Sequence, residues 1–197
     1  MVVMQIRRIT ALILRSTPSR GQVWIVRVFS EQFGRITLSL IAKTNMVPAP
    51  FSLIECSLSS LRGDFGMAKQ VEIIDSFASL SDGSSFLPIV RATIERCLPQ
   101  LAVSQRIWDL VISLLHDFRK FADWKAAALL FVLQFFEQEG VIPYALAEIP
   151  QLSESARTQI KELLGSDLSV WKESQIEKEL LDAALERIGL CIAKGGT

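Results

Sequence analysis

The amino-acid sequence predicts an α+β protein of two domains, a five-stranded β-barrel over residues 1–78 followed by an all-α domain over residues 79–197. Short apolar runs separated by turn residues fill the first domain. After Asp75 the spacing of the apolar residues changes to that of a helix. Half of the 197 residues are hydrophobic, which is enough for a sizeable core and argues against disorder.

Two expected strands, 23–29 and 36–42, flank a turn centred on Gly34. The second strand alternates apolar residues with arginine, threonine and serine, so it has one side for a core and one basic, hydroxyl-rich side. The other three strands are expected at about 9–15, 51–58 and 67–74. Five short strands of this kind suit a small barrel, either an OB-fold or an SH3-like barrel.

The helical domain is expected to begin after a linker at 79–85 that is rich in serine and contains glycine. Apolar residues between 107 and 118 recur at positions i, i+3, i+4 and i+7, as on one face of a helix. Asp123 is a candidate N-cap for a helix at 124–139. Two more helices are expected, one opened by Ser153 or Ser155 and ending at Gly165, and one at about 173–193.

The sequence offers little of the chemistry of an enzyme. His116 is the single histidine, and its place on an amphipathic helix favours a surface residue over a catalytic base. The glycine-rich phosphate-binding motifs do not occur, and Cys56, Cys97 and Cys191 lack the spacing of a metal site or a disulfide framework. We therefore expect no catalytic residue, no metal and no cofactor.

The three widely spaced cysteines, with no disulfide framework, predict a location in the reducing cytoplasm. The N-terminal segment is apolar with Arg7 and Arg8 inside it, and it lacks the ordered basic, apolar and small-residue regions of a signal peptide. The longest apolar run, 126–136, is too short to cross a bilayer. No membrane role is expected.

Charge is distributed unevenly between the two halves. Residues 1–72 contain nine Lys/Arg and four Asp/Glu, a net charge of +5, whereas the remaining residues contain twelve and seventeen, a net charge of −5. A basic barrel suits an anionic partner, and phosphate groups need only positive donors along a surface. The candidate DNA-binding residues are Arg35 and Lys43 first, then Arg15, Arg20 and Arg27, and also Arg7, Arg8, Arg62 and Lys69.

Aromatic residues could add base stacking to these charges. Trp24 is expected to pack in the barrel, because aromatic residues of small barrels are more often core. Phe33 lies beside Gly34 in a turn and is the better candidate for exposure.

Six short segments follow one another along nearly the whole chain: 29–35 (FSEQFGR), Ala42-Lys43, 50–55 (PFSLIE), 62–64 (RGD), Leu98-Pro99, and 131–143 ending in EGVIP. In this order they resemble the bacterial recombination mediator family RecO. Residues 29–35 resemble the family's strand–turn–strand signature, and Ala42-Lys43 the start of its basic loop. The resemblance implies an N-terminal OB-fold domain followed by a helical domain.

The resemblance also implies a function without covalent chemistry: binding and annealing of single-stranded DNA. Implied partners are RecR and the C-terminal tail of single-stranded DNA-binding protein, with RecA loading in recombinational DNA repair as the outcome. DNA contact is implied mainly for the barrel. The chain departs from the family in a short 44–49 loop without charge and in lacking the four-cysteine zinc site of many relatives. Weaker, less salt-sensitive DNA binding is expected from the short loop.

An alternative function remains open at this point. In this alternative the chain is an adaptor whose barrel binds proteins and has little affinity for DNA. The acidic helical half would then determine which protein binds. The sequence does not predict an oligomeric state.

Overall fold

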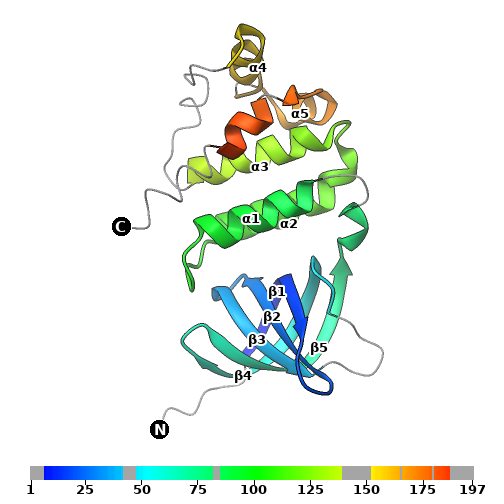
Figure 1. Cartoon of the computed structure of the whole chain (residues 1–197), viewed down its shortest axis with the longest axis vertical. Helices are drawn as coiled ribbons and strands as arrows, with labels where there is room; N and C mark the ends of the chain where they lie inside the picture. Colours follow the sequence, from blue (N-terminus) through cyan, green and yellow to red (C-terminus); the bar gives the residue numbers. More distant parts are fainter. Residues whose placement is uncertain are drawn as a thin grey trace. The chain divides into compact units, whose positions relative to one another are not determined.

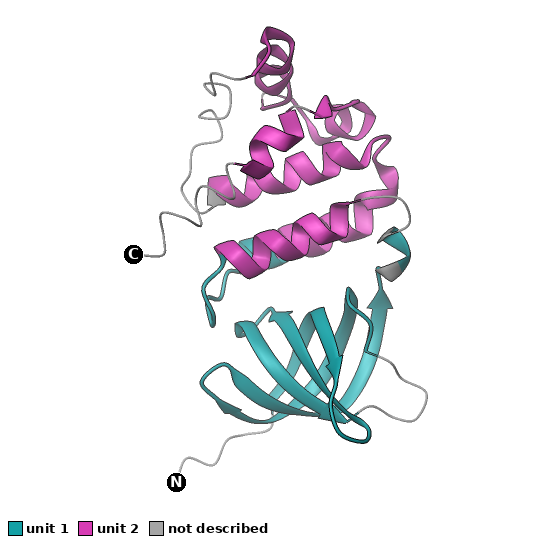
Figure 2. Cartoon of the chain, in the orientation of Figure 1, with its two compact units in different colours: residues 1–82, 98–108 teal, residues 83–97, 109–197 magenta. Residues whose placement is uncertain are grey.

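The computed structural model describes residues 7–41, 48–81, 85–138, 152–164, 166–178 and 180–186. The chain forms two compact units, shown in different colours in Figure 2. One unit contains Met1–Asp82 together with Leu98–Trp108, and the other contains Gly83–Cys97 together with Asp109–Thr197. The predicted fold class, a five-stranded barrel followed by helices, is confirmed.

Five strands close into a barrel in the order β1-β2-β3-β5-β4 (Figure 1). Strand β3 pairs with β5 in parallel, and the other pairs are antiparallel. This order resembles an OB-fold, so the structure favours that barrel over the SH3-like alternative. The strands are β1 Arg7–Pro18, β2 Val23–Ser30, β3 Gly34–Ile41, β4 Ser52–Arg62 and β5 Phe65–Ser76. Strands β4 and β5 are longer than the sequence predicted, because their pairing continues to the tight turn at Gly63.

Alternate residues of strands β1 to β4, with Ala68 and Val71 of β5, fill the barrel. Val26 and Val28 of β2 and Leu38 of β3 are fully buried there, and the alternation in 36–42 predicted this for Leu38. Cys56 lies in the same core, and burial raises the pKa of its thiol to about 11. The thiol is therefore protonated at neutral pH, and Cys56 acts as a small apolar core residue.

Beyond the barrel, the described secondary-structure elements are helices. They are η1 Ala78–Ser81, α1 Phe86–Cys97, α2 Gln105–Asp117, η2 Phe118–Lys120, α3 Trp124–Gln138, α4 Glu154–Leu164 and α5 Leu168–Glu173, and residues 180–186 are also helical. Of these, η1 and the start of α2 belong to the first unit, and the rest belong to the second. Part of the predicted linker at 79–85 is thus a 3₁₀ turn. The predicted end of the 124–139 helix and residues beyond 186 lie outside the described residues.

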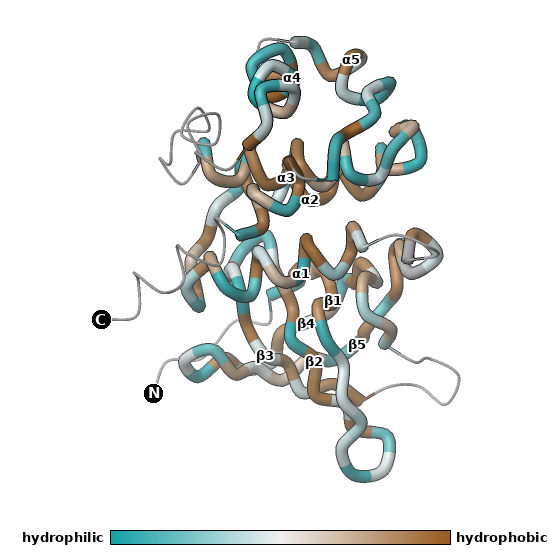
Figure 3. The backbone as a smooth tube through the Cα atoms, turned by 45° about the horizontal axis from the view of Figure 1, so that its top comes forward, coloured by the Kyte–Doolittle hydropathy of each residue, from teal (hydrophilic) through white to brown (hydrophobic). Residues whose placement is uncertain are grey.

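Most residues of helix α3 are hydrophobic (Figure 3), and residues 126–133, 135 and 136 are buried. A helix of this kind forms the centre of a helical core. Among the described residues, no helix has both the length and the apolar character needed to cross a membrane.

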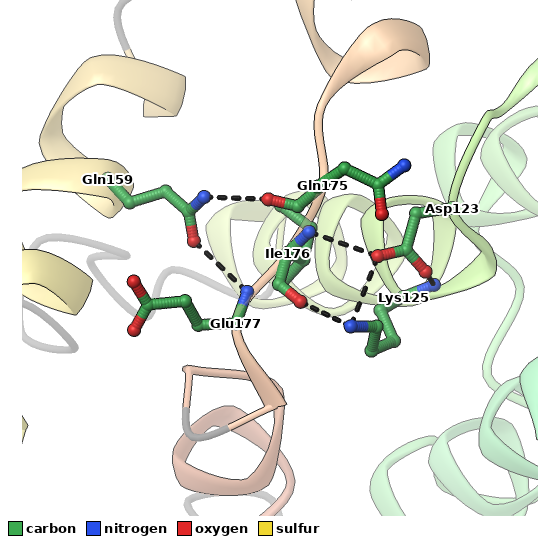
Figure 4. Close-up of polar contacts among 6 residues, drawn as sticks. All are labelled: Asp123, Lys125, Gln159, Gln175, Ile176 and Glu177. Carbon is green, nitrogen blue, oxygen red and sulfur yellow. Dashed lines mark hydrogen bonds and ion pairs between the residues drawn. The ribbon is translucent and has the colours of Figure 1, made fainter.

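Asp123 joins the start of α3 to the segment after α5 (Figure 4). Its Oδ1 accepts the Lys125 backbone N–H at 3.0 Å, which confirms the predicted N-cap. Its Oδ2 accepts the Ile176 backbone N–H at 3.0 Å and pairs with the Lys125 ammonium at 3.2 Å. The Lys125 ammonium also donates to the Ile176 carbonyl.

These contacts explain an error in the predicted 173–193 helix. Residues 174–177 are not helical, since the backbone groups of Ile176 bond to the Asp123 and Lys125 side chains. The Gln159 side chain similarly bonds to the backbone of Gln175 and Glu177. Helical residues resume after this segment.

Replacement of Asp123 by alanine is expected to destabilise the helical unit by about 2–3 kcal/mol. The carboxylate side chain is 6 % exposed, so its loss leaves the Ile176 N–H and the cap donor without their buried acceptor. Chemical denaturation followed by tryptophan fluorescence measures the change. Asp117→Asn is the control, because Asp117 pairs with Lys120 and Lys172 at a more exposed position. A similar loss in both variants would contradict the special role of Asp123.

Candidate nucleic-acid interface

The outer surface of the barrel carries two cross-strand rows that run over β1, β2, β3 and the start of β5. Strand register places Arg15 beside Arg27, Arg27 beside Thr37, and Thr37 beside Phe65. The next row contains Thr17, Ile25, Ser39 and Met67. Residues directly opposite each other on paired strands point to the same side of a sheet. We call these eight residues the basic face.

The basic face has positive charge and no carboxylate. Arg15 and Arg27 are both exposed, and Arg27 forms no ion pair with any described residue. Two like charges opposite each other on neighbouring strands destabilise a sheet. An anionic ligand would remove this repulsion, so the arrangement is suited to phosphate groups.

A β-bulge at Leu14 brings Arg15 to this face. The β1–β2 register shifts between Ile13 and Arg15, and Ile13 points into the core. Under strict alternation Arg15 would point inward as well. The extra residue reverses its direction and sets it opposite Arg27. The sequence pattern alone gave no sign of this bulge.

Turns with exposed arginines lie at both ends of the basic face. Arg20 precedes Gly21, which has φ +63°, in the β1–β2 turn. Arg62 precedes Gly63 in the β4–β5 turn, which is joined to β3 by the Thr37 N–H donating to the Asp64 carbonyl at 2.7 Å. In OB-folds, the β2–β3 surface and these two connections form the usual ligand site.

Residues 98–108, which we call the strap, cover the end of the barrel next to the basic face. The Leu101 N–H donates to the Arg35 carbonyl at 3.3 Å, and Gln100 forms a parallel bridge with Arg35. The Gln100 side chain also donates to Asp64 at 2.9 Å. The ring centroids of Trp108 and Phe29 are 5.6 Å apart.

Because of the strap, Arg35 is less exposed than its leading place among the candidate DNA-binding residues requires. Arg35 is half-buried. Phe29, which lies opposite Arg35 on β2, is 1 % exposed beneath Trp108. The residue expected to lead DNA binding therefore lies at the covered end of the sheet, whereas Arg15 and Arg27 lie on its exposed part. Lys43, the other leading candidate, lies outside the described residues.

Arg8 and Lys69 lie in a different row, on β1, β4 and β5. Both are opposite Ser57. Arg8 pairs with Glu55 and Glu72, so this region has mixed charge and suits a phosphate backbone less well than the basic face does. Arg7 is exposed at the beginning of β1.

The aromatic residues are placed partly as predicted. Trp24 packs against the barrel core, as expected, but Phe33 is also half-buried against it and does not project from its turn. Among the aromatic residues that the structure describes, Phe65 is the exposed one, at 43 %. Its position directly after the 62–64 turn was the available signal, since a residue at the start of a strand beside a tight turn is often uncovered.

The single histidine lies outside the barrel. His116 is exposed on α2, as predicted. In the described part of the chain, no three metal-ligating side chains gather together.

No protein-family model matches the chain, and no curated protein is significantly similar to it.

Proposed function

We propose that the chain is a RecO-like protein that binds and anneals single-stranded DNA through the basic face of its barrel. The observation that carries this proposal is the pair of exposed arginines, Arg15 and Arg27, on an OB-like surface without carboxylates. The position matches the general ligand site of the OB-fold. Arg20 and Arg62 extend the positive charge to the turns at both ends.

Phosphate contacts would supply most of the binding free energy. Each arginine that neutralises a phosphate releases condensed counterions, so the affinity falls as the salt concentration rises. Guanidinium groups also donate paired hydrogen bonds to phosphate oxygens. Neutralised strands repel each other less, which would help two complementary strands to anneal.

The protein partners that we propose are those that the sequence resemblance implies. RecR and the tail of single-stranded DNA-binding protein would cooperate with the chain in RecA loading. We assign no residues to these contacts. The helical unit, which contains most of the acidic residues, is the part left for protein partners.

A protein-binding adaptor is the second candidate, and one observation favours it. Ile41, Phe65 and Met67 are 67 %, 43 % and 50 % exposed on or next to the basic face. Exposed apolar residues within a polar surround are common at protein interfaces. The two candidates differ in their dependence on salt.

Fluorescence anisotropy of a labelled single-stranded oligonucleotide, titrated at several salt concentrations, tests the proposal. We expect binding that weakens steadily with salt, with a logarithmic slope of about −0.7 for each phosphate contacted. A duplex of the same length is the comparison and should bind less tightly. Absence of binding even at low salt would reject the DNA-binding function and favour the adaptor.

A further inference from the structure

Phe65 is an exposed aromatic residue in the same cross-strand row as Arg15 and Arg27. It is opposite Thr37, which is opposite Arg27, so two strand spacings, about 10 Å, separate the backbones of Phe65 and Arg27. The side chains around it on β3, Thr37 and Ser39, are small. A planar group could therefore approach the ring from the solvent.

The backbone around Phe65 is held by the rest of the barrel. The preceding residue, Asp64, accepts a hydrogen bond from the Thr37 N–H. The following residue, Gly66, is buried, and a Cβ there would come within 2.7 Å of the Leu58 side chain and 3.0 Å of the Leu38 side chain. The aromatic ring thus projects from a well-packed strand rather than from a long loop.

We propose that Phe65 is a base-stacking residue that makes the basic face selective for single strands. This inference rests on the proposed DNA-binding function and assigns its specificity. Arg15 and Arg27 would hold phosphates, while an unpaired base stacks on the Phe65 ring. In a duplex the base faces are covered by neighbouring base pairs, so a duplex would keep the phosphate contacts and lose the stacking contact.

The expected effect is large enough to measure. Loss of one base–aromatic stack generally weakens single-strand binding by about 5- to 150-fold. Stacking is uncharged, so its loss should leave the salt slope unchanged, in contrast to the loss of an arginine. Stacking and phosphate binding can therefore be measured separately.

The experiment compares a labelled thymidine oligonucleotide with an abasic strand of the same length. The wild-type protein should prefer the thymidine strand, and Phe65→Ala should remove that preference while keeping the affinity for the abasic strand. Phe65→Trp should restore the preference. Ile74→Ala is the matched control, because Ile74 is also exposed on β5, at 54 %, but lies outside the basic face.

The outcomes separate the inference from the function on which it rests. If Phe65→Ala binds both strands as the wild type does, while Arg15→Ala and Arg27→Ala weaken binding to both, the stacking role is wrong and the DNA-binding function stands. If the wild type binds neither strand at low salt, both proposals fail. Thermal unfolding of each variant excludes a folding defect, and Phe65→Leu supplies a second non-aromatic variant of similar volume.

Discussion

Reversal of charge at Arg15 and Arg27 together, Arg15→Glu with Arg27→Glu, is expected to weaken single-stranded DNA binding by more than about 100-fold at low salt. The variant removes two phosphate contacts and adds two charges that repel the phosphates. The magnitude of the logarithmic salt slope should fall by about 1.4, which is the contribution of two contacts to a single strand. Anisotropy titrations over a range of salt concentrations measure both quantities.

The matched control reverses the same number of charges elsewhere on the barrel. Arg8→Glu with Lys69→Glu changes the net charge equally but alters the mixed-charge row on β1, β4 and β5. If net charge alone determined binding, both double variants would lose affinity equally, and the assignment to the basic face would be wrong. The Arg15/Arg27 variant should also fold normally, since both side chains are exposed.

Gly34→Ala is expected to destabilise the barrel unit by more than about 3 kcal/mol, as two separate costs add. Gly34 has φ +64°, a conformation that costs about 1–2 kcal/mol for a residue with a Cβ. An added Cβ would also lie 2.1 Å from the Ala102 carbonyl oxygen of the strap. The backbone of the strap would have to move away. Chemical denaturation gives the change in the free energy of unfolding.

Gly21→Ala separates the two costs. Gly21 has nearly the same φ, +63°, but an added Cβ meets nothing within 4 Å. Its replacement should therefore cost only the conformational penalty of about 1–2 kcal/mol. Equal losses in the two variants would show that the strap does not press on the Gly34 turn.

Local patterns were sufficient to predict the barrel strands and several helices. The alternation in 36–42 gave the inward and outward sides of β3, and Asp123 marked the start of α3. These features depend on neighbours in the sequence, which a single sequence displays directly. The choice of barrel was harder, because the parallel β3–β5 pairing joins strands that are separated by β4.

The candidate site was predicted less well for the same reason. Arg27 and Arg15 were expected among the candidate binding residues and both are exposed, but a bulge at Leu14 determines where Arg15 points. Arg35 was expected to lead, and the strap that covers its end of the sheet comes from more than sixty residues later in the chain. Nothing near Arg35 in the sequence indicates that cover.

The return of the strap to the barrel unit also has a consequence for the order of events during synthesis. The barrel unit is discontinuous, since α1 separates its first 82 residues from the strap. A ribosome must therefore translate α1 and the strap before the Gly34 turn can receive its cover. A fragment ending at residue 78 would expose Phe29 to water, so transfer of the barrel to another protein requires that the strap be supplied as well.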